Sequence, residues 1–196
     1  ELKSEYQYLA HKFGLQAMDA NQWRFLRLRP QNFPHIRIAQ LAHLYYEQRA
    51  GLSQLLECES VKQVRELLAT QVTHYWETHY VFGEKSAKSE KKLSTASLNL
   101  QIINTVAPIL FAYGKHKNSE KYCERAFDFL ETLKAEENHI VRMWKEVGLM
   151  VETAGDSQAL IQLKKEYCDR KDCLRCRIGY EYLKGSSSIK GLRELG

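Results

Sequence analysis

The chain has 196 residues, of which 44% are hydrophobic and 27% are charged, and its formal net charge is +5. This is the mixture of an ordinary globular protein with enough chain to bury a core, which excludes the intrinsically disordered and low-complexity classes. Only 10 glycines and 3 prolines occur, so few turns are available, and this favours long helices over many short strands.

The first half of the chain contains helical patterns with recognisable ends. We expect a helix over residues 3–13 that ends at Gly14, and Pro34 suits the first position of the next helix, where its missing N–H costs nothing. Ser60 is the expected N-cap of a third helix. Residues 71–82 are ambiguous, because their aromatic and β-branched side chains favour a strand while their spacing is close to helical.

The second half of the chain is dominated by one apolar segment and the helices that follow it. Residues 94–113 are apolar on nearly all sides, which predicts a largely buried helix that Pro108 kinks and Gly114 ends. An amphipathic helix is expected over residues 117–133, and Asn138 is the expected N-cap of the helix after it.

The last helices lead to the prediction for the whole chain. Asp156 or Ser157 is expected to cap a helix that reaches about Tyr167, and a short helix is expected over residues 173–183. We therefore predict an all-α fold, with one compact helical domain over residues 1–184. The glycine- and serine-rich residues 185–196 read as a flexible tail.

The basic charge is unevenly placed. Between Asp19 and Glu47 there is no acidic residue, and the gap contains four arginines: Arg24, Arg27, Arg29 and Arg37. Aromatic and histidine side chains are interleaved with them: Trp23, Phe25, Phe33, His35 and His43. Guanidinium groups suit phosphate and aromatic faces suit unpaired bases, so we predict a surface that contacts the nucleic-acid backbone. The alternative is a structural or protein-interaction domain, in which Arg27 and Arg29 are buried and the arginine cluster bonds loop carbonyls or distant acids.

A second group of basic side chains lies in residues 84–93, which we expect to form a solvated loop. Lys85, Lys88, Lys91 and Lys92 are mixed there with glutamates. The segment has no phosphate-binding glycine pattern.

Three cysteines fall within nine residues, at Cys168, Cys173 and Cys176. A helix would place Cys173 and Cys176 on one face, and three neighbouring thiolates can hold zinc or an iron–sulfur cluster. Either site would need a fourth ligand, for which Cys123 and His139 are the candidates. The alternatives are reduced cysteines that pack as small apolar groups, or redox chemistry.

The sequence also bears on compartment and on catalysis. No apolar run reaches the ~18–20 residues of a membrane helix, and residues 98–113 are interrupted by Gln101, Asn104 and Pro108. An odd number of cysteines does not suit a secreted disulfide framework, so we predict a cytoplasmic protein without membrane contact. No nucleophile–base or metal-hydrolase motif occurs, and no catalytic residue is predicted.

Short strings in a fixed order carry a family resemblance. They include Trp23 with Arg27–Pro30, Asn32–Pro34, Tyr75–Trp76, Phe82–Gly83, Phe111–Gly114, Glu137–Asn138, Ser157–Leu160 and Tyr167–Cys168. Together they resemble the C-terminal half of a bacterial family described only as a domain of unknown function, over the chain to about Leu183. Full-length members of that family carry an N-terminal half similar to PD-(D/E)XK nucleases. The resemblance thus implies a helical module whose partner is a nuclease-like half, and it transfers no catalytic residue.

Overall fold

The computed structural model describes residues 2–47 and 51–184, so the expected tail at 185–196 lies outside the described residues. The described chain is mainly helical, with one small two-stranded sheet, which confirms the predicted fold class. Its contacts group it into two compact units. Unit 1 consists of residues 1–50 and 69–93, and unit 2 of residues 51–68 and 94–196. The expectation of one domain over residues 1–184 stays a prediction.

Unit 1 combines helices with a hairpin. Its elements are α1 (Leu2–Phe13), two 3₁₀ turns (Ala20–Gln22 and Pro30–Asn32), α2 (Pro34–Tyr46), α5 (His74–Glu77), β1 (His79–Val81) and β2 (Glu84–Lys85). The predicted end of the first helix and the predicted start of the second are both confirmed, at Gly14 and at Pro34. The ambiguous segment 71–82 becomes one helical turn followed by a strand, which pairs antiparallel with β2.

The interior of unit 1 is small and partly polar. Its buried apolar side chains among the described residues are Ile36, Leu44 and Val72. The buried Gln40 side chain donates a hydrogen bond to the Lys91 carbonyl at 2.7 Å. This hydrogen bond joins α2 to the segment that follows the hairpin.

Lys91 is itself buried, with 2% of its surface exposed. Its Nζ donates to the Glu77 carbonyl at 2.8 Å and to Ser89 Oγ at 3.2 Å, and it lies 4.2 Å from the centre of the Tyr80 ring. The prediction of a solvated lysine-rich loop is therefore wrong at Lys91, whose charge is satisfied by carbonyl, hydroxyl and aromatic partners. Lys85, Lys88 and Lys92 are exposed as expected.

The regular elements in the described residues of unit 2 are all helical. Its elements are α3 (Leu52–Glu57), α4 (Val61–Leu68), α6 (Thr95–Gln101), a π-helical turn (Ile102–Val106), α7 (Ala107–Lys117), α8 (Glu120–Thr132), α9 (His139–Glu146), α10 (Ala154–Leu163), a second π-helical turn (Lys164–Cys168) and α11 (Arg177–Leu183). The N-caps predicted at Ser60 and Asn138 are confirmed by bonds from the Gln63 and Val141 N–H groups at 3.3 and 3.0 Å.

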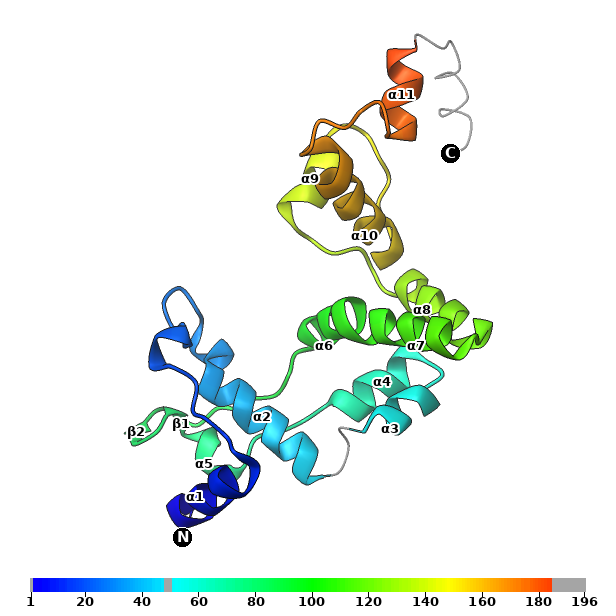
Figure 1. Ribbon diagram of the computed structural model, residues 1–196. Coiled ribbons are helices and arrows are strands. Elements are labelled where there is room, and N and C mark those ends of the chain that lie inside the picture. The colour runs from blue at the N-terminus through cyan, green and yellow to red at the C-terminus, as the bar shows by residue number, and fades with distance from the viewer. Residues whose placement is uncertain (1, 48–50, 185–196) are drawn as a thin grey trace. The chain divides into compact units, whose positions relative to one another are not determined.

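The core of unit 2 forms around the apolar segment predicted to be buried. α6, the π-helical turn and α7 run as one continuous helical stretch, and α8 lies alongside α7 (Figure 1). Ile102 and Leu110 of this stretch are buried together with Phe129 of α8. Proline lacks an N–H donor, and just before Pro108 the Ala107 N–H bonds the Ile102 carbonyl, so the expected kink takes the form of a π-helical turn.

Gly114 does not end this helix, contrary to the prediction. α7 continues to Lys117 and ends where Asn118 adopts a left-handed φ of 51°. A Cβ at Gly114 would lie 2.7 Å from Cys123 Sγ and 2.9 Å from the Ser119 carbonyl oxygen. The glycine is therefore needed for the close approach of α7 and α8, which a local sequence pattern does not reveal.

The stretch Thr95–Lys117 is also the one helix in the described part of the chain that is long and apolar enough to cross a membrane, with a mean hydropathy of 1.3. Gln101, Asn104 and Pro108 interrupt the apolar residues of this stretch, so no membrane helix was predicted from the sequence. The core helix of a soluble protein passes the same test, and Ile102 and Leu110 of this stretch are core residues. The finding is weak evidence for a membrane span.

The predicted cap at Asp156 or Ser157 is wrong by three residues. Thr153 is the N-cap of α10, because its Oγ1 accepts the Asp156 N–H at 3.1 Å while Asp156 Oδ2 accepts the Thr153 N–H at 2.9 Å. This reciprocal pair is a capping box, in which Asp156 is the third helical residue. The bonds from Thr153 hold the pKa of the Asp156 carboxyl below its ordinary value.

Candidate nucleic-acid interface

The acid-free stretch of the sequence lies in unit 1, in the segment that leads into α2. Arg24, Arg27 and Arg29 are exposed, and within the described residues none of their side chains makes a hydrogen bond or an ion pair. The structural alternative required such bonds and burial for Arg27 and Arg29, so that expectation is wrong for them. The three guanidinium groups keep their donors available for an external acceptor.

Arg37 differs from the other three arginines. It is half-buried in α2, where its Nη1 donates to Gln40 Oε1 at 3.0 Å and its Nη2 donates to Asn32 Oδ1 at 2.6 Å. Burial lowers the pKa of the Arg37 guanidinium. Arg37 therefore has the arrangement of the structural alternative, since it joins the second 3₁₀ turn to α2.

The aromatic side chains of the same stretch form a cluster with the hairpin. The Phe25 ring lies 5.3 Å from the Phe33 ring and 5.2 Å from the His35 ring, measured between centroids. His35 in turn lies 6.3 Å from Trp76 and 5.7 Å from Phe82. The Nδ1 atom of His35 is buried and has no hydrogen-bond partner among the described residues.

Sequence reasoning missed the contribution of the hairpin to this surface. Phe82 is 70% exposed and Tyr75 is 42% exposed, and neither was named as a candidate. The available signal was the density of aromatic residues in the ambiguous segment beside the lysine-rich loop. Their contact with the arginine-bearing segment depends on tertiary packing, so spacing along the chain does not predict it.

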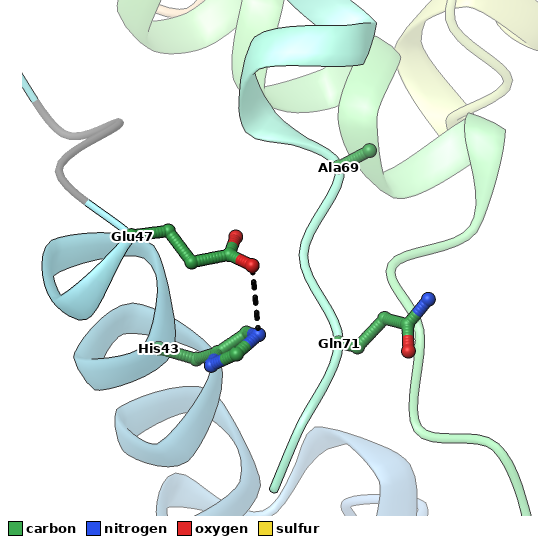
Figure 2. Close-up of a pocket in the computed structure, with 4 residues that line it drawn as sticks. All are labelled: His43, Glu47, Ala69 and Gln71. Atoms are coloured by element: carbon green, nitrogen blue, oxygen red, sulfur yellow. Dashed lines mark ion pairs between the residues drawn. The ribbon is translucent and has the colours of Figure 1, made fainter.

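His43, the remaining histidine of the stretch, lines a pocket of about 700 Å³ with Glu47, Ala69 and Gln71. Figure 2 shows the His43 and Glu47 side chains extending from α2 toward the segment that carries Ala69 and Gln71. His43 Nε2 lies 3.3 Å from Glu47 Oε1. The glutamate orients the imidazole, and neither Ala69 nor Gln71 supplies a hydroxyl or thiol that this pair could activate.

The cysteine cluster has a different geometry from the one predicted. α11 begins at Arg177 with Cys176 as its N-cap, so Cys173 and Cys176 precede the helix and do not share a helical face. All three cysteines are unpaired, Cys176 being buried and the other two exposed. The pKa of the Cys168 thiol is raised, first by burial and then by the Cys176 thiol, which favours its protonated form.

The two candidate fourth ligands, Cys123 and His139, lie in other helices of unit 2. Cys123 lies on α8, where its Sγ is 3.7 Å from the Phe111 carbonyl oxygen, and His139 begins α9. Across residues 2–47 and 51–184, no three histidine, cysteine or acidic side chains are grouped so as to hold a metal ion. Ligation of zinc or an iron–sulfur cluster by Cys168, Cys173 and Cys176 stays a prediction.

Fold and site together define a mainly helical protein with an exposed surface of arginine and aromatic side chains in unit 1. The family described as "Protein of unknown function (DUF2851)" matches residues 1–139, and the chain belongs to this family. The match supports the resemblance to an uncharacterised family over residues 1–139, which include all of unit 1, and the strings after residue 139 lie outside it. No curated protein matches the chain, and no solved structure does.

Proposed function

We propose that this chain is a non-catalytic helical module whose unit 1 contacts the backbone of a nucleic acid through Arg24, Arg27 and Arg29. The observation that carries the proposal is the exposure of these three guanidinium groups without an internal partner in the described residues. Paired phosphate oxygens match the guanidinium fork, and such bonds are charge-assisted. Arg37 has a supporting role, because its side chain is already engaged by Asn32 and Gln40.

The distribution of charge between the units supports this assignment. Unit 1 contains 11 lysines and arginines against 7 acidic residues, whereas unit 2 contains 18 against 17. Most of the net charge of +5 therefore belongs to the smaller unit. A local excess of positive charge raises the concentration of a polyanion near that surface and speeds association.

The backbone at Arg27 supports a role for its side chain. Its φ of 64° lies in the left-handed region, which disfavours residues with a Cβ and favours glycine or asparagine. An exposed arginine with no internal bond contributes nothing evident to the fold there. Conformational strain of this kind is concentrated at functional positions.

The natural partner of the module is, in this proposal, a nuclease-like half that precedes it in the longer protein, in a cytoplasmic setting. The resemblance to a family with longer members supports this reading, and the match over residues 1–139 supports membership of an uncharacterised family. Sequencing of the reading frame upstream of residue 1 tests it directly. Carboxylates at nuclease spacing would support the partner, and a reading frame that lacks them would contradict it.

A salt titration tests the contact with nucleic acid. We expect binding of a labelled oligonucleotide to weaken as salt rises from about 50 to 200 mM, with a log–log slope of about −2 if three arginines neutralise three phosphates of a single strand. The R27Q/R29Q double variant should bind more weakly, and its slope should be smaller by about 1.4. Fluorescence anisotropy measures both quantities.

The matched control is the R142Q/R177Q double variant. Arg142 and Arg177 are exposed arginines of unit 2, so their replacement removes the same charge from the other unit. We expect this control to keep nearly all of the affinity. Equal losses in the two double variants would mean that net charge alone drives binding, and undetectable binding at low salt would remove the proposal.

A further inference from the structure

Two aromatic rings are exposed to solvent, one at the tip of the hairpin and one on α5 beside it. Phe82 lies in the turn between β1 and β2 and is 70% exposed, and Tyr75 of α5 is 42% exposed. Large aromatic side chains at a turn are costly to leave in water, because each exposes apolar area that burial would remove. Both rings belong to unit 1, the unit that carries the candidate arginines.

Neighbouring rings and one backbone N–H group fix the positions of the Tyr75 and Phe82 rings. Tyr75 stacks on the buried His79, with ring centroids 4.0 Å apart and an angle of 7° between the planes. The Gly83 N–H donates to the Tyr75 hydroxyl oxygen at 3.0 Å. The Phe82 ring rests on the edge of Trp76, at a centroid distance of 4.9 Å. Rings fixed in this way lose little side-chain entropy when a ligand stacks on them.

The rings are continuous with the arginine-bearing segment. Phe25, which directly follows Arg24, contacts His35, and His35 contacts Phe82 at a centroid distance of 5.7 Å. The exposed rings and the arginine-bearing segment are therefore connected through ring contacts within one unit. Lys85 and Lys88, which follow the turn in the chain, are exposed as well, although Lys88 pairs with Glu77 at 3.0 Å.

We infer that the ligand of unit 1 is a single-stranded nucleic acid whose unpaired bases stack on Phe82 and Tyr75 while Arg24, Arg27 and Arg29 bind its phosphates. The inference rests on the proposed function and adds the class of ligand. Stacking on aromatic rings beside a basic surface is how proteins hold single strands without reading their sequence. A duplex offers its phosphates but keeps its base faces inside the helix, so the hairpin tip gives it no contact.

Three ligands separate stacking from phosphate binding: a labelled oligothymidylate of about 16 nucleotides, a duplex of the same length, and an abasic oligodeoxyribose phosphate of the same length. The protein is the 196-residue chain. The test variant is Phe82→Ala, and Phe82→Leu keeps an apolar contact with Trp76 should the alanine variant fold poorly. Phe127→Ala is the control, since Phe127 is 55% exposed in unit 2.

We expect the unchanged protein to bind oligothymidylate more tightly than the duplex or the abasic strand. Phe82→Ala should weaken binding of oligothymidylate by about fivefold or more and leave the other two ligands unchanged, because only oligothymidylate stacks. Phe82→Leu should show most of the same loss, and Phe127→Ala should show none. Anisotropy titrations at one low salt concentration give all of these ratios.

The other outcomes distinguish the two proposals. If Phe82→Ala binds all three ligands like the unchanged protein while R27Q/R29Q weakens them all, the single-strand inference is overturned and the proposed function stands. If none of the three ligands binds, the proposed function and the single-strand inference are both overturned. Concentration-dependent self-association that Phe82→Ala abolishes, together with no nucleic-acid binding, would overturn the inference by assigning the tip to a protein contact.

Discussion

The two units of this protein reach a folded state by different means. In unit 2, twelve buried apolar residues form one cluster drawn from α3 to α10, with Phe129 and Leu110 almost fully enclosed. In the described part of unit 1 only Ile36, Leu44 and Val72 are buried apolar residues, while four buried residues are polar or charged: Gln40, Thr70, His79 and Lys91. The interior of the larger unit is held together mainly by burial of apolar side chains, which has no preferred direction. The interior of the smaller unit depends more on hydrogen bonds, which are directional.

This difference has a functional consequence. Because unit 1 commits few apolar side chains to an interior, its aromatic rings and arginines remain at the surface, available to a ligand. Unit 2 has almost balanced charge and contains the larger cluster of buried apolar residues. The predictions below test whether stability and binding are divided between the units in this way.

The largest expected effect is the removal of the central ring of the unit 2 core. Phe129→Ala should lower the free energy of unfolding by about 3–5 kcal/mol, because it deletes a side chain that is 2% exposed and leaves a cavity. Phe127, two residues earlier on α8, is 55% exposed, and its replacement by alanine should cost under about 1 kcal/mol. Urea unfolding measures both. Similar losses for the two variants would contradict the assigned core.

The next effect concerns the close approach of α7 and α8. Gly114→Ala should cost up to about 3 kcal/mol, because its Cβ would press on the Cys123 backbone N at 2.9 Å, which cannot rotate away. Gly155 is the control: a Cβ there meets nothing closer than 3.5 Å, so Gly155→Ala should be neutral or stabilising by up to about 1 kcal/mol. Thermal melts measure both variants. A smaller decrease in Tm for Gly114→Ala than for Gly155→Ala would contradict the close packing of α7 against α8.

Lys91 tests the polar interior of unit 1. Lys91→Met keeps the length of the side chain but removes its bonds to the Glu77 carbonyl and Ser89, and it should cost about 2 kcal/mol. Lys92→Met changes an exposed neighbour and should alter stability by less than about 0.5 kcal/mol. Hydrogen exchange over residues 69–93 would locate the loss. An unchanged exchange rate in Lys91→Met would show that unit 1 does not depend on this residue.

The smallest effect is a pH dependence at the start of α10. Bonds from Thr153 lower the pKa of Asp156 in the folded protein, so this carboxylate stabilises the fold at neutral pH and the gain is lost as pH falls through its folded pKa. Asp156→Asn keeps an acceptor but removes the charge, and it should cost about 0.5–1 kcal/mol at pH 7. The difference should vanish once the pH lies below the folded pKa of Asp156, where the carboxyl is protonated. A difference that grows on acidification would contradict this sign.

The caps at Ser60 and Asn138 were predicted from the sequence, whereas the cap of α10, the start of α11 and the contacts between distant residues were not. The caps at Ser60 and Asn138 depend on bonds to residues three positions away, so the sequence around them is sufficient. Gly114 and Lys91 were misread because their roles depend on Cys123 of α8 and on Glu77, both distant along the chain. A glycine at a helix end and one at a helix contact are alike in sequence.

The candidate site follows the same division. Exposure of Arg24, Arg27 and Arg29 agrees with an acid-free stretch, whereas the engagement of Arg37 by Asn32 becomes visible only once the 3₁₀ turn is folded. The cysteine prediction assumed that a helix includes Cys173, but the helix begins at Arg177. Phe82 joined the site through its contact with His35, a residue 47 positions earlier.

The central claim is that unit 1, and not unit 2, contacts a nucleic acid. Photo-crosslinking tests it most directly: an oligonucleotide that carries 5-bromouracil is irradiated with the full chain, and the adducts are mapped by mass spectrometry. We predict adducts within residues 21–37 and 75–85, with Phe82 and Tyr75 among the modified positions. Adducts confined to residues 94–184, or none at saturating oligonucleotide, would contradict the claim.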